Sequence, residues 1–387
     1  MFRQMSRKDQ IEEMFLGIVQ GKPYTGKPIP LNRLSIGGLA YSVEQEIKRK
    51  LGEKEETLKD KLNMFRGDLG ERKIIDNLFR EFSISAEKDD CALVENGDEY
   101  LLLSTDIIRE STHIPKGATA LQIGRFLANL NLSDIAAMAG KPTGMLVSYL
   151  VSPDTDESFF KEIVSGISGA LKAQNADLLG GDTKEGSELV ISGTVLGHQK
   201  KELVRQRKHI AKGQIVGVTN NLGKSASGYV FYKSKYKQSL GIELMMNITP
   251  RIREAQIISE HGGKFMMDLS DGLFSSIHQM KSDYGIGFKI VEDELPANNY
   301  VKKASEISGR NATEIICQFG GDYELFFSID NNNYKDFMDS MESEKVRVAF
   351  IGEAWEGNNM IYDGKRWSPI HETGYEHFSA KPHLGYT

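Results

Sequence analysis

The chain has 387 residues, enough for two or three domains, and its 40% hydrophobic and 26% charged residues are ordinary for a globular protein. The net charge of -6 argues against general nucleic-acid binding, which needs a surplus of lysine and arginine. Two cysteines, Cys91 and Cys317, exclude a disulfide framework and favour a cytoplasmic location. No apolar run reaches the ~18 residues of a membrane span, so we expect no membrane association.

The first 66 residues are more basic than the rest of the chain. They carry thirteen lysines and arginines against nine acids, and residues 46–62 form a charged, helix-like run. We predict an N-terminal extension over residues 1–66 without a catalytic role, either a docking arm or a poorly packed leader.

The next 140 residues alternate between strand and helix patterns. Apolar residues at helical spacing between 74 and 82 precede short apolar runs at 91–94 and 100–105, which predict strands. Further along the chain, helices are predicted at 118–138 and 159–172, and strands at 144–151, 176–180 and 188–197. Residues 67–205 are therefore expected to form a first α/β domain with antiparallel character.

The second half of the chain repeats this alternation without an internal sequence repeat. The expected order is a strand in the run from 209 to 223, a helix at 250–260, a strand at 264–268, a helix from 273, and strands at 285–291, 317–329 and 347–354. Residues 206–387 are predicted to form a second α/β domain.

Aspartates stand where predicted elements end, and one lies inside a helix. Asp134 shares a helical stripe with Leu127 and Leu130, and burying an unpaired carboxylate there costs several kcal/mol. The acids at element ends are Asp89, Asp90, Asp106, Asp182, Asp268 and Asp271. Each one alone is also a common helix cap or turn former. Carboxylates that converge at strand ends repel one another, and oxygen-only ligands favour Mg²⁺.

Glycine turns mark two possible phosphate contacts. The run LLGGDT places Gly180 and Gly181 just before Asp182, where the backbone can approach an anion closely. The run NLGKSASG at 221–228 opens an apparent helix, whose free N–H groups could meet an anion, although ordinary turn chemistry is the favoured explanation of this run.

The motifs occur in the order found in thiamine-monophosphate kinases, which belong to the aminoimidazole ribonucleotide synthetase superfamily. These motifs are KDDCALV, STD with His113 seven residues after its Asp, NLSDIAAM, LLGGDT, LVR, DLSDGL, DYELFF and GYEHF. The resemblance covers residues 67–378. It implies a two-domain α/β (α+β) fold with mixed sheets and helices packed on one side, and a homodimer that transfers the γ-phosphoryl group of ATP directly to thiamine monophosphate.

The resemblance also implies roles for particular residues. Several Mg²⁺ ions would be held by Asp89, Ser104, Thr105, Asp106, Asp134, Asp182 and Asp268. Asp271 would also help to hold these ions and, with Arg205, act at the catalytic centre. Gly181, Asp182, Arg205 and Ser270 would contact ATP, and His113, Tyr375 and the position of Gly321 would contact thiamine monophosphate. The acceptor is a phosphate monoester that is already anionic at neutral pH, so no general base is needed.

The chain departs from the family pattern at two places. Lys88 replaces a glycine before the paired acids, and Gly321 replaces a glutamate that contacts the substrate, with Asp322 as a possible substitute. Two alternatives therefore stay open. One is another ATP-using member of the superfamily with a different phosphate acceptor, and the other is an inactive paralogue that binds Mg-ATP.

Overall fold

The structure is a computed structural model that describes residues 77, 79, 81, 82 and 88–371. The chain divides into two compact units, Met1–Leu69 and Gly70–Thr387, and all described residues belong to the second. The predicted extension and Tyr375 lie outside the described residues. None of the described helices is long and apolar enough to cross a membrane.

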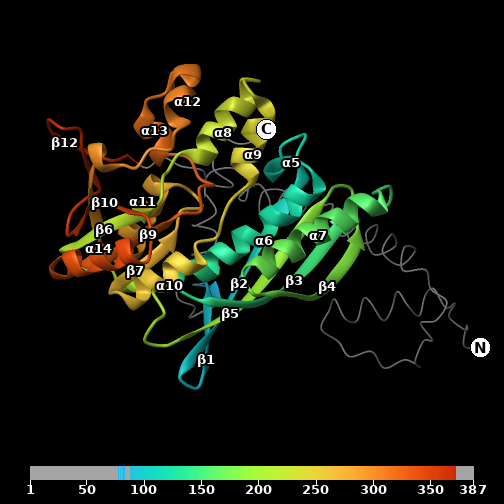
Figure 1. Cartoon of the computed structure of the whole chain (residues 1–387), viewed down its shortest axis with the longest axis horizontal. Coiled ribbons are helices and arrows are strands. Elements are labelled where there is room, and N and C mark those ends of the chain that lie inside the picture. Colours follow the sequence, from blue (N-terminus) through green and yellow to red (C-terminus); the bar gives the residue numbers. More distant parts are fainter. Residues whose placement is uncertain (1–76, 78, 80, 83–87, 372–387) are drawn as a thin grey trace, which may run out of the picture. The chain divides into compact units, whose positions relative to one another are not determined.

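The first sheet has five strands in the order β1-β2-β5-β3-β4 (Figure 1). Its strands are β1 (Ala92–Asn96), β2 (Glu99–Arg109), β3 (Lys141–Val151), β4 (Asp177–Glu185) and β5 (Val190–Lys200). Only β3 and β4 pair in parallel, so the sheet is mixed, as expected. The helices of this half are α5 (Glu110–His113), α6 (Ala120–Ala137) and α7 (Glu157–Ala173).

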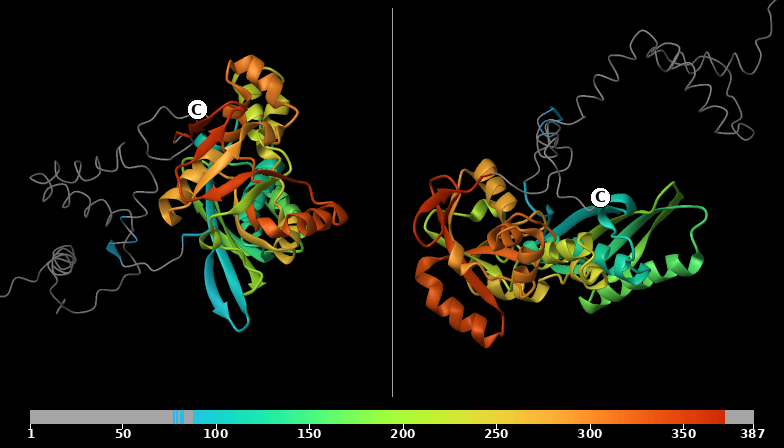
Figure 2. Two further views of the ribbon diagram at one scale, coloured as in Figure 1. Left: turned by 90° about the vertical axis from the view of Figure 1, so that its left-hand side faces the viewer. Right: turned by 90° about the horizontal axis from the view of Figure 1, so that it is seen from above.

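Helix α6 is the central element of the described unit. A capping box fixes its start: the Thr119 hydroxyl accepts from the Gln122 N–H at 3.2 Å, and the Gln122 side chain accepts from the Thr119 N–H at 2.9 Å. The helix is buried on nearly all sides, because it packs on β2 and β5, on α7, and on β7 and α10 of the second half (Figure 2). Its apolar sequence is the local cause of this burial.

The second sheet has seven strands in the order β12-β11-β8-β10-β6-β9-β7 and is also mixed. Its strands are β6 (Gln214–Thr219), β7 (Gly263–Asp268), β8 (Gly287–Val291), β9 (Leu325–Asp330), β10 (Val348–Trp355), β11 (Met360–Tyr362) and β12 (Trp367–Pro369). The helices of this half are α8 (Lys224–Lys233), α9 (Gln238–Met246), α10 (Ile252–Glu260), α11 (Leu273–Tyr284), α12 (Val301–Ser308), α13 (Ala312–Cys317) and α14 (Tyr334–Ser343). Three short 3-10 turns, Arg207–His209, Glu292–Glu294 and Asn331–Asn333, complete the elements.

Helices cover the two sheets differently. Along β9, Phe327 belongs to the core around α6, α10 and α14, whereas the adjacent Phe326 belongs to the core under α8, α11 and α13. Because neighbouring strand residues point to opposite faces, the second sheet is covered on both sides. Among the described residues, the helices that pack on the first sheet, α6 and α7, lie on one face, so this half alone shows the one-sided packing that we expected.

Candidate functional site

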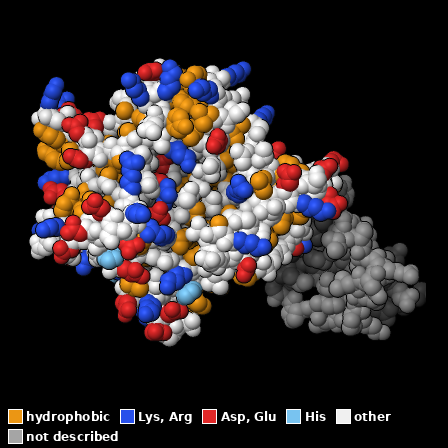
Figure 3. Space-filling model, in the orientation of Figure 1, with side chains coloured by type: hydrophobic (Ala, Val, Ile, Leu, Met, Phe, Trp, Pro, Cys, Tyr) orange, Lys and Arg blue, Asp and Glu red, His pale blue; other side chains and the backbone are white. Residues whose placement is uncertain are grey.

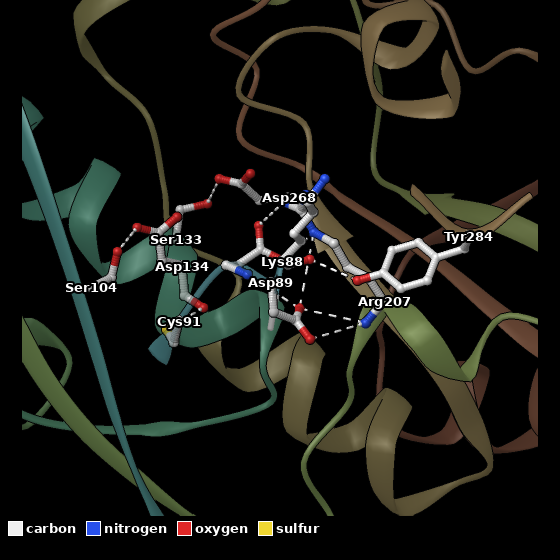
Figure 4. A network of polar contacts seen from close by, with 10 residues as sticks. Lys88, Asp89, Cys91, Ser104, Ser133, Asp134, Arg207, Asp268 and Tyr284 are labelled. Atoms are coloured by element: carbon white, nitrogen blue, oxygen red, sulfur yellow. Dashed lines mark hydrogen bonds and ion pairs between the residues drawn. The ribbon is translucent and has the colours of Figure 1, made fainter. Parts of the chain in front are cut away.

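Four aspartates from three separate segments converge on one buried site, which we call the acid cluster (Figure 4). Its members are Asp89, Asp90, Asp134 and Asp268. One carboxylate oxygen from each of Asp90, Asp134 and Asp268 lies within 4.8 Å of the other two. Asp90 precedes β1, Asp134 lies in α6, and Asp268 ends β7. The Ser133 hydroxyl donates to Asp268 Oδ2 at 2.7 Å and so joins α6 to the second sheet.

One arginine, which the sequence reasoning missed, balances part of this charge. Arg207 donates from Nε and Nη2 to the two carboxylate oxygens of Asp90 at 3.0 and 2.5 Å. Its backbone N–H donates to Asp89 Oδ2 at 3.2 Å. Burial alone would lower the pKa of Arg207, but the neighbouring Asp90 carboxylate reverses this and holds the pKa above its usual value. A single guanidinium therefore faces four carboxylates.

The remaining negative charge shows in the pKa values of the acids. Burial, followed by repulsion from Asp90, raises the pKa of both Asp89 and Asp268 to about 7. Burial and repulsion from Asp106 raise the pKa of Asp134 well above its usual value. Bound protons or cations are therefore needed to neutralise the negative charge of this cluster at neutral pH. Its all-oxygen donors, gathered within bonding reach of one small ion, fit Mg²⁺ or a similar hard divalent cation.

Strand β2 contributes alternate residues to the cluster. The Ser104 hydroxyl donates to Asp134 Oδ2 at 2.5 Å, and Asp106 lies close enough to raise the pKa of Asp134. Thr105 lies between them in sequence, is exposed, and donates to the Gly193 carbonyl oxygen at 2.9 Å. Because strand residues alternate in direction, Ser104 and Asp106 face α6 and Thr105 faces away. Within this single chain, the expected place of Thr105 among the metal ligands is not observed.

Asp182 also lies outside the acid cluster. Its side chain is 63% exposed on the edge strand β4 and pairs with Lys184 at 3.0 Å, an interaction that lowers its pKa. Strand register aligns Asp182 with Ser148, then Ser192, then Ile107, so it points away from α6. Gly181 lies in the adjacent row, where a Cβ would come within 1.8 Å of the Val147 carbonyl oxygen. Close strand packing thus explains Gly181 without a nucleotide, and the expected joint site of Asp182 with the other acids is not formed by one chain.

Arg205 is placed differently from our expectation. Its guanidinium donates to the carbonyl oxygens of Glu202 at 2.8 Å and Ser259 at 2.7 Å, and burial lowers its pKa. These bonds tie the segment before β6 to the end of α10. Arg207, two residues later, is the arginine that meets the acids. The two arginines of LVRQR could not be distinguished by sequence spacing alone.

The loop after β7 carries Ser270 and Asp271, and a second loop packs directly on it. The Gly321 N–H donates to the Ser270 carbonyl oxygen at 2.7 Å, and a Cβ on Gly320 would lie 2.1 Å from that oxygen. Ser270 is exposed and Asp271 half-buried. Both residues remain at the rim of the acid cluster, where a nucleotide contact is still a prediction.

Of the residues predicted to contact thiamine monophosphate, the structure describes His113 and Gly321. His113 ends α5, and its Nδ1 accepts from the Arg109 N–H at 3.3 Å. Gly321 has a φ of 90°. Asp322 is not available as a substitute contact, because it accepts from the N–H groups of Gly223 at 2.5 Å and Ser225 at 2.9 Å. The free N–H groups expected at the start of α8 are therefore satisfied by the chain itself.

Lys88, the other departure from the family pattern, points away from the metal ligands. Its ammonium group pairs with Asp283 at 3.0 Å, and its carbonyl oxygen accepts from the Tyr284 hydroxyl at 2.8 Å (Figure 4). It neither crowds the cluster nor lies poised for a phosphate there.

Comparison with known proteins shows what this chain is similar to. Residues 88–199 match the family described as AIR synthase related protein, N-terminal domain. The chain is 27% identical to the thiamine-monophosphate kinase of Aquifex aeolicus, over 80% of this chain and 99% of the relative. It is 29% identical to that of Pyrococcus horikoshii, over 80% and 96%.

Solved structures agree with the sequence matches. AaThiL complexed with AMPPCP and TMP superimposes with a TM-score of 0.71 at 25% identity, covering 80% of this chain and 97% of that one. The hydrogenase maturation protein HypE of E. coli shares the fold, with a TM-score of 0.61 at 18% identity, covering 78% of this chain and 97% of its own.

Proposed function

We propose that this chain, a member of the AIR synthase related proteins, phosphorylates thiamine monophosphate to thiamine diphosphate with ATP as the phosphoryl donor. The AaThiL complex with an ATP analogue and TMP supports this pair of substrates. The observation in this chain that carries the proposal is the acid cluster, in which Asp90, Asp134 and Asp268 gather oxygen ligands around one point.

The acids of the cluster and the residues that bond to them would have different roles in binding Mg²⁺. Asp90, Asp134 and Asp268 would hold Mg²⁺, which screens the phosphate charge when it is bound. Arg207 fixes the two paired acids through its bidentate bond to Asp90, and Ser104 and Ser133 orient Asp134 and Asp268. No side chain needs to remove a proton, because the acceptor phosphate is already anionic. The chemistry then reduces to alignment for in-line attack and stabilisation of charge.

We further infer a homodimer that covers the exposed face of the first sheet. Ile107, Leu146 and Leu179 are 61%, 50% and 54% exposed on strands β2, β3 and β4, whereas α6 and α7 cover the opposite face. Large apolar side chains exposed together on one sheet face are an unfavourable surface to leave in water. A second copy would bury it and would bring Thr105 and Asp182 into the interface. Ile107→Lys should then halve the mass in sedimentation, and a monomeric unsubstituted chain would refute the dimer.

Direct assay tests the activity. The full chain, incubated with ATP, thiamine monophosphate and Mg²⁺, should yield thiamine diphosphate by chromatography, and excess EDTA should abolish the product. Absence of product at high enzyme concentration would overturn the proposal. Tight Mg-ATP binding in calorimetry without turnover would instead support the inactive paralogue. The cytoplasmic location stays a prediction, for which the buried, unbonded Cys91 and Cys317 offer support.

A further inference from the structure

A second group of side chains, which takes no part in the acid cluster, includes a residue whose backbone packs on the loop after β7. The ring centroids of Tyr229, on α8, and Phe319, which follows α13, are 5.9 Å apart at an interplanar angle of 46°. The Arg310 guanidinium lies 5.7 Å from the Phe319 ring centroid. All three residues are half-buried. We call Tyr229, Phe319 and Arg310 the aromatic–arginine cluster.

Two cationic side chains lie close to these rings. Within the described part of the chain, no carboxylate pairs with the Arg310 guanidinium, whose contact is the Phe319 ring. Lys233 Nζ lies 5.9 Å from the Tyr229 ring centroid. Burial raises the pKa of the Tyr229 hydroxyl, although Arg310 opposes the change. Figure 3 shows hydrophobic side chains exposed over α8 and α12 with lysines and arginines around them. A partner for Arg310 must therefore supply hydrogen-bond acceptors.

Backbone packing fixes the aromatic–arginine cluster to the loop that leaves the acid cluster. A Cβ on Gly272 would lie 2.4 Å from the Phe319 carbonyl oxygen, so the two main chains are in direct contact there. Gly272 has a φ of 92°, which a side chain would strain. Gly272 is the fourth residue after Asp268, so their Cα atoms are at most roughly 14 Å apart along a fully extended chain. A substrate whose phosphates reach Asp268 can thus extend toward Phe319.

The chemistry of the cluster selects one class of ligand group. Aromatic side chains bind flat heterocycles by stacking, and this is worth about 1–3 kcal/mol per base. A guanidinium donates N–H groups in a planar fork that suits ring nitrogens as acceptors. Two nearby cations disfavour a positively charged ring such as thiazolium. The adenine of ATP and the aminopyrimidine of thiamine monophosphate are both neutral rings with acceptor nitrogens.

We propose that the aromatic–arginine cluster binds the neutral nitrogen heterocycle of one substrate while its phosphates occupy the acid cluster. This inference rests on the proposed function for the identity of the two candidate rings. It assigns binding roles to Tyr229, Phe319 and Arg310, which no predicted site included.

Steady-state kinetics with each substrate varied in turn tests the assignment. Phe319→Leu and Arg310→Gln should each raise the KM for one substrate about tenfold, with kcat within about twofold, because ring binding is common to the ground and transition states. A rise for ATP identifies adenine, and a rise for thiamine monophosphate identifies the aminopyrimidine. If neither KM changes, the proposal is wrong.

Matched substitutions elsewhere control for loss of an aromatic ring or an arginine. Tyr334 is 45% exposed with its ring 5.1 Å from that of Phe350, and Arg253 pairs with Glu344 on the surface. Tyr334→Leu and Arg253→Gln should leave both KM values unchanged. Equal KM effects in these controls would contradict a specific ring site.

Calorimetry with adenosine and with free thiamine separates this inference from the proposed function. Neither probe carries a phosphate, so binding does not depend on turnover or on a metal. The unsubstituted full chain should bind one probe, and Phe319→Leu should weaken that binding about tenfold at an unchanged melting temperature. Binding of neither probe would overturn the ring site even if the kinase assay succeeds. Probe binding that weakens in the variant would sustain the ring site even if the kinase assay fails.

Discussion

One buried acid, Glu324, and the acid cluster have their negative charge balanced in opposite ways. Glu324, 6% exposed, accepts from Arg251 at 2.8 and 2.5 Å, from Thr219 at 2.6 Å and from Asn220 at 3.1 Å. Its charge and hydrogen-bonding capacity are met by the chain itself. The acid cluster instead sets four carboxylates against Arg207 and has raised pKa values. The difference indicates that a structural acid is neutralised by its own fold, whereas a ligand-binding acid is left to be neutralised by what binds.

The largest expected effect on stability comes from substituting Glu324, the acid whose charge the fold itself balances. Glu324→Gln leaves the half-buried Arg251 guanidinium with only its 3.6 Å pair to Glu254 and should lower the free energy of unfolding by about 3 kcal/mol in urea denaturation. The exposed pair of Arg253 and Glu344, 3.1 Å apart, is the control. Glu344→Gln should change stability by no more than about 0.5 kcal/mol. Equal losses of unfolding free energy in Glu324→Gln and Glu344→Gln would contradict a special structural role for Glu324.

Substitution in the acid cluster should instead lower activity without lowering stability. Asp134→Asn removes a charge but little volume, so kcat/KM should fall by about 100- to 1,000-fold and Mg-ATP binding should weaken. The melting temperature without Mg²⁺ should hold or rise, because repulsion with Asp106 and Asp268 is relieved. Asp339→Asn, on the exposed face of α14, is the matched control. If Asp134→Asn binds Mg-ATP normally, Asp134 has only a structural role.

Asp322 lies between the two cases, since backbone N–H groups satisfy it without a paired cation. Burial raises its pKa to about 6 from 3.8. The folded state therefore holds the proton more tightly, and the stability from this group is full below pH 4 and is lost as pH rises through about 6. Measured against Asp322→Asn, the unsubstituted chain should lose up to roughly 3 kcal/mol of unfolding free energy between pH 4 and 7. A difference independent of pH would contradict the raised pKa.

The smallest expected effect concerns Gly321 beside the aromatic–arginine cluster. Gly321→Glu places a side chain at a φ of 90° and should cost about 1–2 kcal/mol of stability. It should also raise activity on thiamine monophosphate if the missing glutamate limits recognition. Gly213, with a φ of 84° and open space around its Cβ position, gives the control for backbone strain alone. Gly213→Glu should show a similar stability loss with unchanged activity.

Much of the fold could be read from the sequence, because local periodicity reports local structure. The helix predicted at 118–138 is α6, and the strand predicted at 264–268 is β7 within one residue. The short helices α12 and α13 and strands β11 and β12 were not predicted, since each is too short to show a period. The helical stripe that carried Asp134 correctly indicated that distant residues must compensate this acid. One of these is Ser104, which donates to it, and a cation bound in the cluster stays a proposal.

The sequence by itself determined the α/β alternation, the aspartates at element ends and the oxygen-only character of the acid cluster. Only the tertiary structure decided which of those groups meet. It placed Arg207 rather than Arg205 on the acids, turned Asp182 and Thr105 to the opposite face of the first sheet, and used Asp322 to cap α8. The physical reason is that strand alternation and sheet register fix side-chain direction through long-range pairing, which residue spacing along the chain does not encode.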